Sequence, residues 1–291
     1  MTVVNKATDN MQSIKSITEK VRAGNLDALE IIEDTRQVIS ETDGGIRAWQ
    51  TLDWDEVDRQ VEVLVSNSNW RSLPLAAVPI AVKDVYDTDN FVTTYGSSIY
   101  SSHRPSRDAK LVSILRSLGA IVVGKTVTTE FAYWQPGPTV NPYNKKHTPG
   151  GSSSGSAAAV SSGMIPIALG SQTAASVIRP ASYCGVYGFK PSYGILPLDG
   201  VKPLAPSLDH AGFLARSLED IKIFFTAILG HEHFSQRPLK LRGKTASELA
   251  VTTLSGAWEM VLQRDCQQAV ADCFAGAKSR GSKFSEEVVF S

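Results

Sequence analysis

The chain has 291 residues, 42% hydrophobic and 20% charged, proportions typical of a soluble globular protein with a sizeable core. Lys and Arg together number 29, as do Asp and Glu, and this zero net charge argues against binding to nucleic acid or to an anionic membrane. Cys184, Cys266 and Cys273 lack metal-ligand spacing, which favours reduced thiols in a cytoplasmic protein. No apolar run approaches the roughly 18 residues that a membrane span needs.

The first 70 residues predict a helical layer. Apolar residues recur at helical spacing within 13–66, with breaks at Gly24-Asn25 and at 43–45. A third amphipathic segment follows from Asp55 to Val65. Because such apolar faces must be buried, we expect these helices to cover a sheet.

From residue 78 onward, short apolar strands alternate with helices. We expect strands at 78–82, 120–124 and 165–169, and helices at 108–118, 154–162 and, capped by Ser217, up to Leu229. Further on we expect a strand at 248–253, a helix at 264–279 and a strand at 287–290. The alternation is typical of α/β layering. Because the last unit ends with the chain, we expect a sheet that is incomplete there, with an open edge that invites a partner.

A Gly/Ser-rich run at 150–156 is the most informative feature, and Ser176 follows 24 residues after Ser152. The run fits a flexible linker, or a loop that opens a helix and offers backbone N–H groups to an anion. A phosphate loop would need Gly-Lys-Ser/Thr, which is absent. The run also contains Gly-x-Ser-x-Gly, the nucleophile elbow of α/β-hydrolases, with Ser153 as nucleophile. Asp209 and His210 could complete that triad, although adjacent side chains rarely form one relay.

Lys83 ends the apolar stretch 78–82. A lysine at a strand end is usually solvated. Burial among apolar neighbours would instead lower its pKa and make it a usable base. One lysine and two serines, Lys83, Ser152 and Ser176, therefore make a candidate base, relay and nucleophile for cleaving amides without metal or histidine.

Taken together, these segments resemble the amidase signature family. The matching motifs are 82–84, 124–126, 130–132, the Gly/Ser run with its 24-residue step to Ser176, 179–181, 184–191, 207–212 and 215–217. The similarity covers residues 10–240 and is strongest from 78 to 217. It implies an α/β fold in which a mixed β-sheet core is covered by helices in an α/β/α layering, incomplete at the C-terminus.

The resemblance also implies one domain over residues 1–291. Its expected parts are an N-terminal helical layer at 1–70, a catalytic core at 71–230 and a truncated C-terminal portion at 231–291. Family members usually run well beyond this length. The three candidate catalytic residues all precede residue 177, so the missing portion would supply walls of the substrate pocket rather than the chemistry.

The resemblance implies a Lys83–Ser152–Ser176 triad. Neutral Lys83 would accept a proton through Ser152 while Ser176 attacks a carboxamide carbonyl and forms an acyl-enzyme. Residues expected to support these loops structurally are Ser153, Ser154 and Arg179. The triad implies neither metal nor cofactor.

The loop before Ser176 departs from the common family pattern Asp-Thr-Gly-Gly-Ser, because it reads Gln172-Thr173-Ala174-Ala175-Ser176. Its backbone N–H groups would hold the oxyanion, which makes Thr173, Ala174 and Ala175 the expected substrate-binding residues. If either alanine needs left-handed backbone, it costs about 1–2 kcal/mol. The two methyl groups also crowd the place of the carbonyl.

We therefore expect a cytoplasmic amidase that acts on a small-molecule amide and binds neither nucleic acid nor membrane. One alternative is a catalytically impaired or truncated relative that acts as an interaction partner. Another is the glutaminase-type subunit of an amidotransferase, which supplies ammonia to a partner subunit. A homodimer and a partner subunit both fit the sequence. By position alone, Tyr133, Trp134 and Gln135 are expected to shape an acyl pocket.

Overall fold

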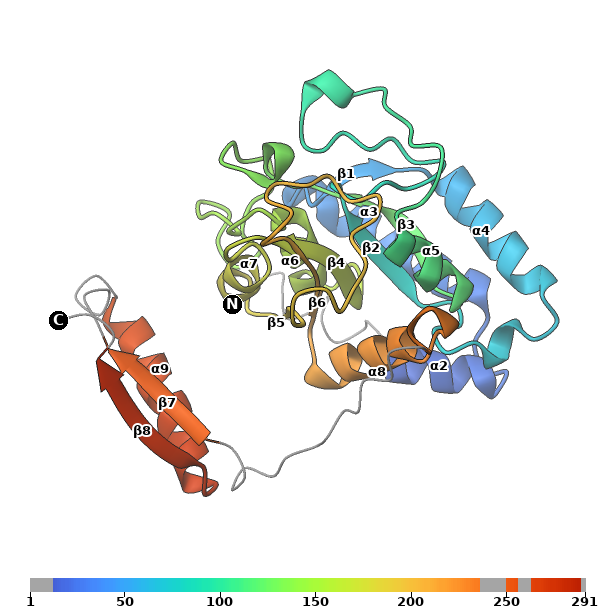
Figure 1. Cartoon of the computed structure of the whole chain (residues 1–291). Coiled ribbons are helices and arrows are strands. Elements are labelled where there is room, and N and C mark those ends of the chain that lie inside the picture. Colours follow the sequence, from blue (N-terminus) through green and yellow to red (C-terminus); the bar gives the residue numbers. More distant parts are fainter. Residues whose placement is uncertain (1–12, 236–249, 256–262, 289–291) are drawn as a thin grey trace. The chain divides into compact units, whose positions relative to one another are not determined.

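The computed structural model describes residues 13–235, 250–255 and 263–288. The chain divides into two compact units, Met1–Arg237 and Pro238–Ser291. Each unit is described by itself (Figure 1). The single domain expected over residues 1–291, with its three parts, stays a prediction. No helix within the described ranges is long and apolar enough to cross a membrane.

The first unit is built on a six-stranded mixed sheet with the strand order β1-β3-β2-β4-β6-β5 (Figure 1). The strands are β1 (Trp49–Leu52), β2 (Pro79–Lys83), β3 (Ile121–Thr126), β4 (Ile167–Gln172), β5 (Tyr187–Phe189) and β6 (His210–Ala215). Strand β2 lies at the centre, parallel to both β3 and β4, and the outer pairs are antiparallel. The α/β fold with a mixed sheet that the sequence predicts is confirmed.

Helices from both ends of this unit pack on the sheet and on one another. They are α2 (Ile14–Arg22), α3 (Ala28–Thr42), α4 (Trp54–Ser66), α5 (Lys110–Ser117), α6 (Ser154–Ser161), α7 (Ile178–Tyr183) and α8 (Leu218–Leu229). Single 3₁₀ turns lie at Asp43–Gly45, Trp70–Ser72, Ser98–Tyr100, Glu130–Ala132 and Glu232–Phe234. The side chain of Ser217 accepts a hydrogen bond from Asp220 N (3.0 Å), which confirms the expected N-cap of α8.

The expectation of helices throughout 13–66 is wrong at Trp49–Leu52, which forms the edge strand β1. A segment of four residues is too short to show a periodic pattern of apolar residues. Their partner is β3, far along the chain, so local sequence carries no signal of the pairing. Strands β5 and β6 and the short helix α7 were likewise not expected from the sequence.

Helix α6 is buried along its whole length, because it consists mostly of small residues. A Cβ added at Gly155 would collide with Ala48 O and with the backbone of Val127, so this helix runs against neighbouring backbone. Gly155 N donates to Val127 O (2.9 Å), just beyond the end of β3. This close approach fixes the start of α6, and with it the Gly/Ser-rich run, at the edge of the sheet where β2, β3 and β4 end.

The second unit contains β7 (Ala250–Ser255), α9 (Arg264–Ser279) and β8 (Lys283–Val288). Strands β7 and β8 pair in parallel, and α9, which connects them in the chain, lies alongside the pair (Figure 1). The helix expected at 264–279 is confirmed, and a strand is present near each expected place. Residues 248–249 and 289–290 of the expected strands lie outside the described residues.

Candidate active site

Lys83 is the last residue of β2 and is completely buried. Its Nζ donates to Ser152 Oγ at 2.7 Å and to Ser171 Oγ at 2.9 Å. Strands β2 and β4 are parallel with Val82 opposite Leu169, so their carboxyl ends meet at the same edge of the sheet. The structure thus joins the expected base to the expected relay, and adds Ser171 as a second hydroxyl partner that the sequence did not indicate.

The amine of Lys83 sits in an unusual electrostatic environment. Burial lowers its pKa to about 7, and the negative charge of Asp209 acts in the opposite direction. Among the described residues, no carboxylate lies within ion-pairing distance of Lys83 Nζ. A large fraction of this amine is therefore neutral near pH 7, as a general base requires.

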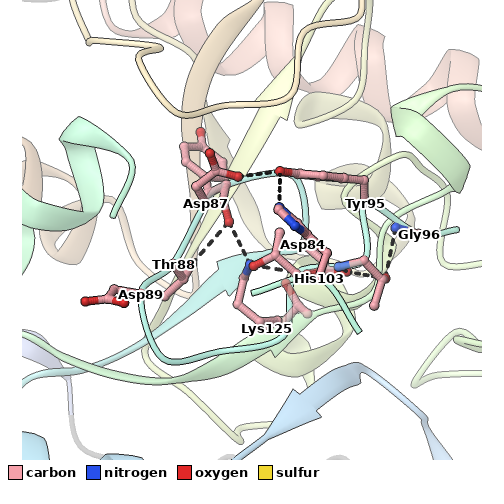
Figure 2. Close-up of polar contacts among 12 residues, drawn as sticks. Asp84, Asp87, Thr88, Asp89, Tyr95, Gly96, His103 and Lys125 are labelled. Atoms are coloured by element: carbon pink, nitrogen blue, oxygen red, sulfur yellow. Dashed lines mark hydrogen bonds and ion pairs between the residues drawn. The ribbon is translucent and has the colours of Figure 1, made fainter. Parts of the chain in front are cut away.

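A second buried lysine shows the contrast. Lys125 on β3 is also completely buried, but it forms an ion pair with Asp84 (3.2 Å), the residue after Lys83 (Figure 2). Burial lowers the pKa of Lys125 to about 8, and the charge of Asp84 opposes this effect. The two neighbouring strands therefore carry one lysine paired with a carboxylate and one paired only with oxygens of serines.

The Gly/Ser-rich run is ordered rather than a flexible linker. The peptide bond Gly151–Ser152 is cis. Arg179 donates from Nε and Nη2 to Gly151 O at 3.0 and 2.7 Å. Ser154 Oγ donates to Val127 O at 3.3 Å. These contacts are of the kind that a supporting role for Arg179 and Ser154 requires.

Ser153 does not fit the nucleophile-elbow interpretation. It is completely buried, and its Oγ donates to Ser171 O at 3.3 Å. His210, the histidine of that hypothesis, directs Nδ1 at Leu208 O (2.6 Å). A nucleophile must be open to its substrate, so the contacts of Ser153 favour support of the site.

Ser176 is half-buried and follows β4. Its carbonyl oxygen accepts from Ser153 N at 3.2 Å, which ties this loop to the start of α6. In the part of the chain that the structure describes, its hydroxyl makes no hydrogen bond to Ser152 or Lys83. The structure therefore brings two of the three expected catalytic residues into contact and places the third on an adjacent loop.

Gln172 organises this loop, because its Oε1 accepts from Val177 N (2.8 Å) and Ile178 N (3.0 Å). Within the described ranges, the backbone N–H groups of 173–176 donate to no protein acceptor, so they are available to an oxyanion. Neither Ala174 nor Ala175 has a positive φ. The strain considered for left-handed alanines therefore does not arise.

A cavity of about 360 Å³ adjoins the loop. Its walls are formed by Ala132, Ser171, Thr173, Tyr193, Leu198, Val201, Lys202, Pro203, Leu204, Pro206 and Asp209. Ser171 both lines the cavity and contacts Lys83, so this one side chain links the cavity to the buried amine. Ala132 lines it, whereas Tyr133 and Trp134 are largely exposed and, like Gln135, take no part in its wall. Residues 133–135 therefore do not shape this cavity, contrary to the expectation from their position in the sequence.

The side chain of Asp209 links two segments of the cavity wall, one containing Thr173 and the other containing Leu204. Its Oδ1 accepts from Thr173 Oγ1 at 2.5 Å, and its Oδ2 accepts from Leu204 N and Ala205 N, both at 2.9 Å. Because each oxygen already has donors, this carboxylate is fully engaged within the protein. It shapes the wall of the cavity and exerts its charge on Lys83.

We expect Asp209→Asn to shift the pH dependence of the site toward lower pH. Asn keeps the shape and can still accept from the two backbone N–H groups while its amide donates to Thr173. Removal of the negative charge lowers the pKa of Lys83, so the amine becomes neutral at lower pH. The measurement is the pH at which modification of Ser176 by a fluorophosphonate reaches half of its maximal rate.

The matched control is Asp199→Asn, which removes a carboxylate outside the cavity wall. This variant is expected to leave the pH midpoint unchanged. A midpoint in Asp209→Asn that stays equal to that of the unmodified protein, or moves to higher pH, would contradict the electrostatic role given to Asp209.

Comparison with known proteins places the chain in a family. The sequence profile of the family described as Amidase matches residues 30–287. The chain belongs to this amidase family, as the resemblance of its motifs predicted.

Among curated proteins, the chain is 38% identical over 227 residues to a glutamyl-tRNA(Gln) amidotransferase subunit of Exiguobacterium sibiricum, covering 75% of this chain and 46% of that protein. It is 34% identical over 266 residues to the subunit of the same name from Saccharolobus solfataricus, covering 86% and 54%. The chain thus spans about half the length of the curated relatives it matches.

Solved structures agree on the fold. Native peptide amidase from Stenotrophomonas maltophilia superposes with a TM-score of 0.84 at 26% identity, over 97% of this chain and 63% of that one. A chain of a vestigial protein complex, described as revealing the evolutionary origins of an s-triazine catabolic enzyme, superposes with a TM-score of 0.83 at 30% identity. That match covers 96% of this chain and 64% of the other.

Proposed function

We propose that this chain hydrolyses carboxamides through a Ser176 acyl-enzyme, with Ser152 as proton relay and Lys83 as base. The observation that carries the proposal is the contact of a completely buried lysine with a serine hydroxyl at 2.7 Å. Burial of an amine is costly, and the lowered pKa of Lys83 gives it the protonation state that a base needs near pH 7. A structural lysine would be expected to have a carboxylate partner, as Lys125 does.

In the proposed reaction, Ser176 Oγ attacks the carbonyl carbon and loses its proton to Ser152, which passes its own proton to Lys83. Backbone N–H groups of the 173–176 loop receive the oxyanion, and one such donor contributes about 3–4 kcal/mol. Lys83 returns the proton through Ser152 to the leaving amine as the C–N bond breaks. Water then attacks the acyl-enzyme by the same relay, which releases the carboxylate and restores Ser176.

The relay requires the Ser176 hydroxyl to come within hydrogen-bonding distance of Ser152. Catalytic hydrogen bonds are often longer in the absence of substrate and shorten when substrate binds. The loop that must adjust is short, since Gln172 and Val177 hold its two ends.

A second candidate is a subunit of an amidotransferase, in which the same chemistry would release ammonia for a partner subunit. The observation that favours it is the identity of 34–38% to chains named as such a subunit. The two candidates share the site and differ in dependence on a partner. Ammonia release from simple amides by the chain alone would favour the first candidate.

The proposal is tested by modifying the purified chain with a fluorophosphonate and locating the label by mass spectrometry. We expect the label on Ser176, and its loss in Ser176→Ala. Ser113→Ala, which removes an exposed serine on α5, is the matched control and should be labelled normally.

A folded protein that takes up no label would overturn the proposal and favour the non-catalytic relative. A label on Ser153 would instead assign the nucleophile to the elbow motif. Labelling of Ser176 together with hydrolysis of an amide that is abolished by Ser176→Ala would establish the acyl-enzyme route.

A further inference from the structure

Lys202 lies in the cavity wall with its ammonium over three aromatic rings. Its Nζ is 5.2 Å from the ring centroids of Tyr95 and Tyr100, and 5.8 Å from that of Phe131. We name Tyr95, Tyr100 and Phe131 the aromatic cluster. A cation at such distances is attracted to the faces of the rings, so the cluster holds the charge of Lys202 in place.

The aromatic cluster is built rigidly. Tyr100 packs edge-on against both other rings, with centroids 5.0 and 6.0 Å apart. Phe131 N donates to Tyr95 O at 2.8 Å. Tyr95 OH donates to Asp87 Oδ1 (2.5 Å) and lies 3.2 Å from His103 Nε2 (Figure 2). The position of these rings is therefore fixed by polar contacts as well as by packing.

Backbone conformation in this corner is also unusual. Tyr95 and Phe131 have positive φ values of 54° and 49°, and Ala132, which lines the cavity, has 59°. Residues with side chains avoid this region, at a cost of about 1–3 kcal/mol each, and such strain gathers at functional sites. Of these three residues, Tyr95 and Phe131 lie against the ammonium of Lys202, and Ala132 lines the cavity.

Lys202 is anchored to the segment that carries the proposed base. Its backbone N donates to Val85 O at 2.8 Å, two residues after Lys83. The preceding residue, Val201, forms a β-bridge with Tyr86. Asp87 N donates to Gly200 O at 2.8 Å. The backbone of Lys202 is thus held at a fixed place relative to the end of β2.

The ammonium of Lys202 is not satisfied by an anion. In the described part of the chain, its Nζ forms neither an ion pair nor a hydrogen bond to oxygen. Asp209 is the carboxylate of the same wall, but both of its oxygens already accept from Thr173, Leu204 and Ala205. None of the three rings belongs to the cavity wall, whereas Lys202 does. A positioned cation with unused donors therefore faces a cavity large enough for a small ligand.

We propose that Lys202 binds a carboxylate of the substrate, so that the site takes carboxamides whose acyl part carries a negative charge. The inference rests on the proposed amidase function and names its substrate class. The ligand carboxylate would accept hydrogen bonds from Nζ on the side away from the aromatic cluster. Ser171 and Thr173 line the same cavity, which would direct the amide end of such a substrate toward Lys83 and the 173–176 loop.

The test compares matched amides that differ in one charge. Succinamate, glutaramate and adipamate, the monoamides of dicarboxylic acids with four to six carbons, are paired with butyramide, valeramide and hexanamide. Dissociation constants are measured by calorimetry on the Ser176→Ala variant, which prevents turnover. We expect at least one anionic amide to bind about tenfold to a hundredfold more tightly than its neutral partner, the range for a hydrogen bond to a charged group.

Lys202→Met is expected to remove this preference, and Lys202→Arg to retain it. Lys146→Met, which removes an exposed lysine outside the cavity, should leave every constant unchanged. If Lys202→Met does not fold, Lys202→Gln removes the charge while keeping hydrogen-bond donors. Higher salt should weaken binding of the anionic amides alone.

Equal affinity within all three pairs, or a preference that persists without the Lys202 charge, would overturn the inference. The test of the anion site and the test of the proposed amidase function can give different results. A Lys202-dependent preference in a chain that hydrolyses no amide would support the anion site and defeat the amidase proposal. Hydrolysis of neutral and anionic amides with equal kcat/KM would support the amidase and defeat the anion site.

Discussion

Replacement of Lys83 by Met is expected to slow the modification of Ser176 by a fluorophosphonate about 10²- to 10⁴-fold, the usual contribution of a general base. Met has nearly the same length but cannot accept a proton from Ser152. Lys83 is completely buried and its amine contacts Ser152 Oγ and Ser171 Oγ, so the change removes two hydrogen bonds but leaves no buried charge without a partner. The folded state should therefore persist, and thermal unfolding of the variant is the check.

The same experiment has a defined pH dependence. Burial lowers the pKa of Lys83 to about 7, and only the neutral amine accepts a proton. Below this pH the ammonium predominates and modification is slow; above it the rate rises and levels off. In Lys83→Met the rise near pH 7 should disappear. Lys146→Met serves as the control, with an unchanged rate and profile.

Two results would contradict the role of Lys83. One is a rate that does not vary between pH 5 and 9 in the unmodified protein, since this would mean that no group with a pKa near 7 controls Ser176. The other is an unchanged rate in a folded Lys83→Met variant. Either would shift attention to Ser171, the remaining polar side chain that contacts Lys83.

Strands β2, β3 and β4 were predicted within a few residues because each is a buried apolar run, and such runs are recognisable locally. Helix α8 was predicted from its N-cap at Ser217, and helix α9 was predicted over the range that it occupies. Strand β1 was missed because it has four residues and pairs with a distant strand. Pairing between strands that are distant in sequence depends on the tertiary structure, so the local sequence pattern does not predict it.

The candidate site was predictable in part. The motif resemblance indicated Lys83 and Ser152 as partners, and the structure places them in contact. The second contact, from Lys83 to Ser171, depends on the register of β2 against β4, and one residue of slip would turn Ser171 away. The cavity and the aromatic cluster join segments near 95, 131 and 202, whose proximity follows from the fold alone.

Replacement of Lys125 by Met is expected to destabilise the first unit by about 3–5 kcal/mol, the cost of leaving one charge of a buried ion pair without its partner. Lys125 and Asp84 are both completely buried (Figure 2). Lys125 Nζ also donates to Tyr86 O and Thr93 Oγ1, both at 2.6 Å. Loss of the ammonium therefore removes three interactions. Chemical denaturation measures the change, and a fall in Tm of roughly 6–20 °C should accompany it.

The double variant Asp84→Asn/Lys125→Met separates the cost of an unpaired charge from the cost of lost packing. It removes the carboxylate along with the ammonium, and Asn can still accept through its Oδ1 from Thr94 N, as Asp84 Oδ2 does at 2.9 Å. We expect it to be more stable than Lys125→Met alone, because no buried charge is left without a partner. If Lys125→Met were as stable as the unmodified protein, the pair would contribute nothing to the fold. Because Asp84 directly follows Lys83, the last residue of β2, such a result would also mean that the pair does not hold the end of this strand, where the proposed base contacts Ser152.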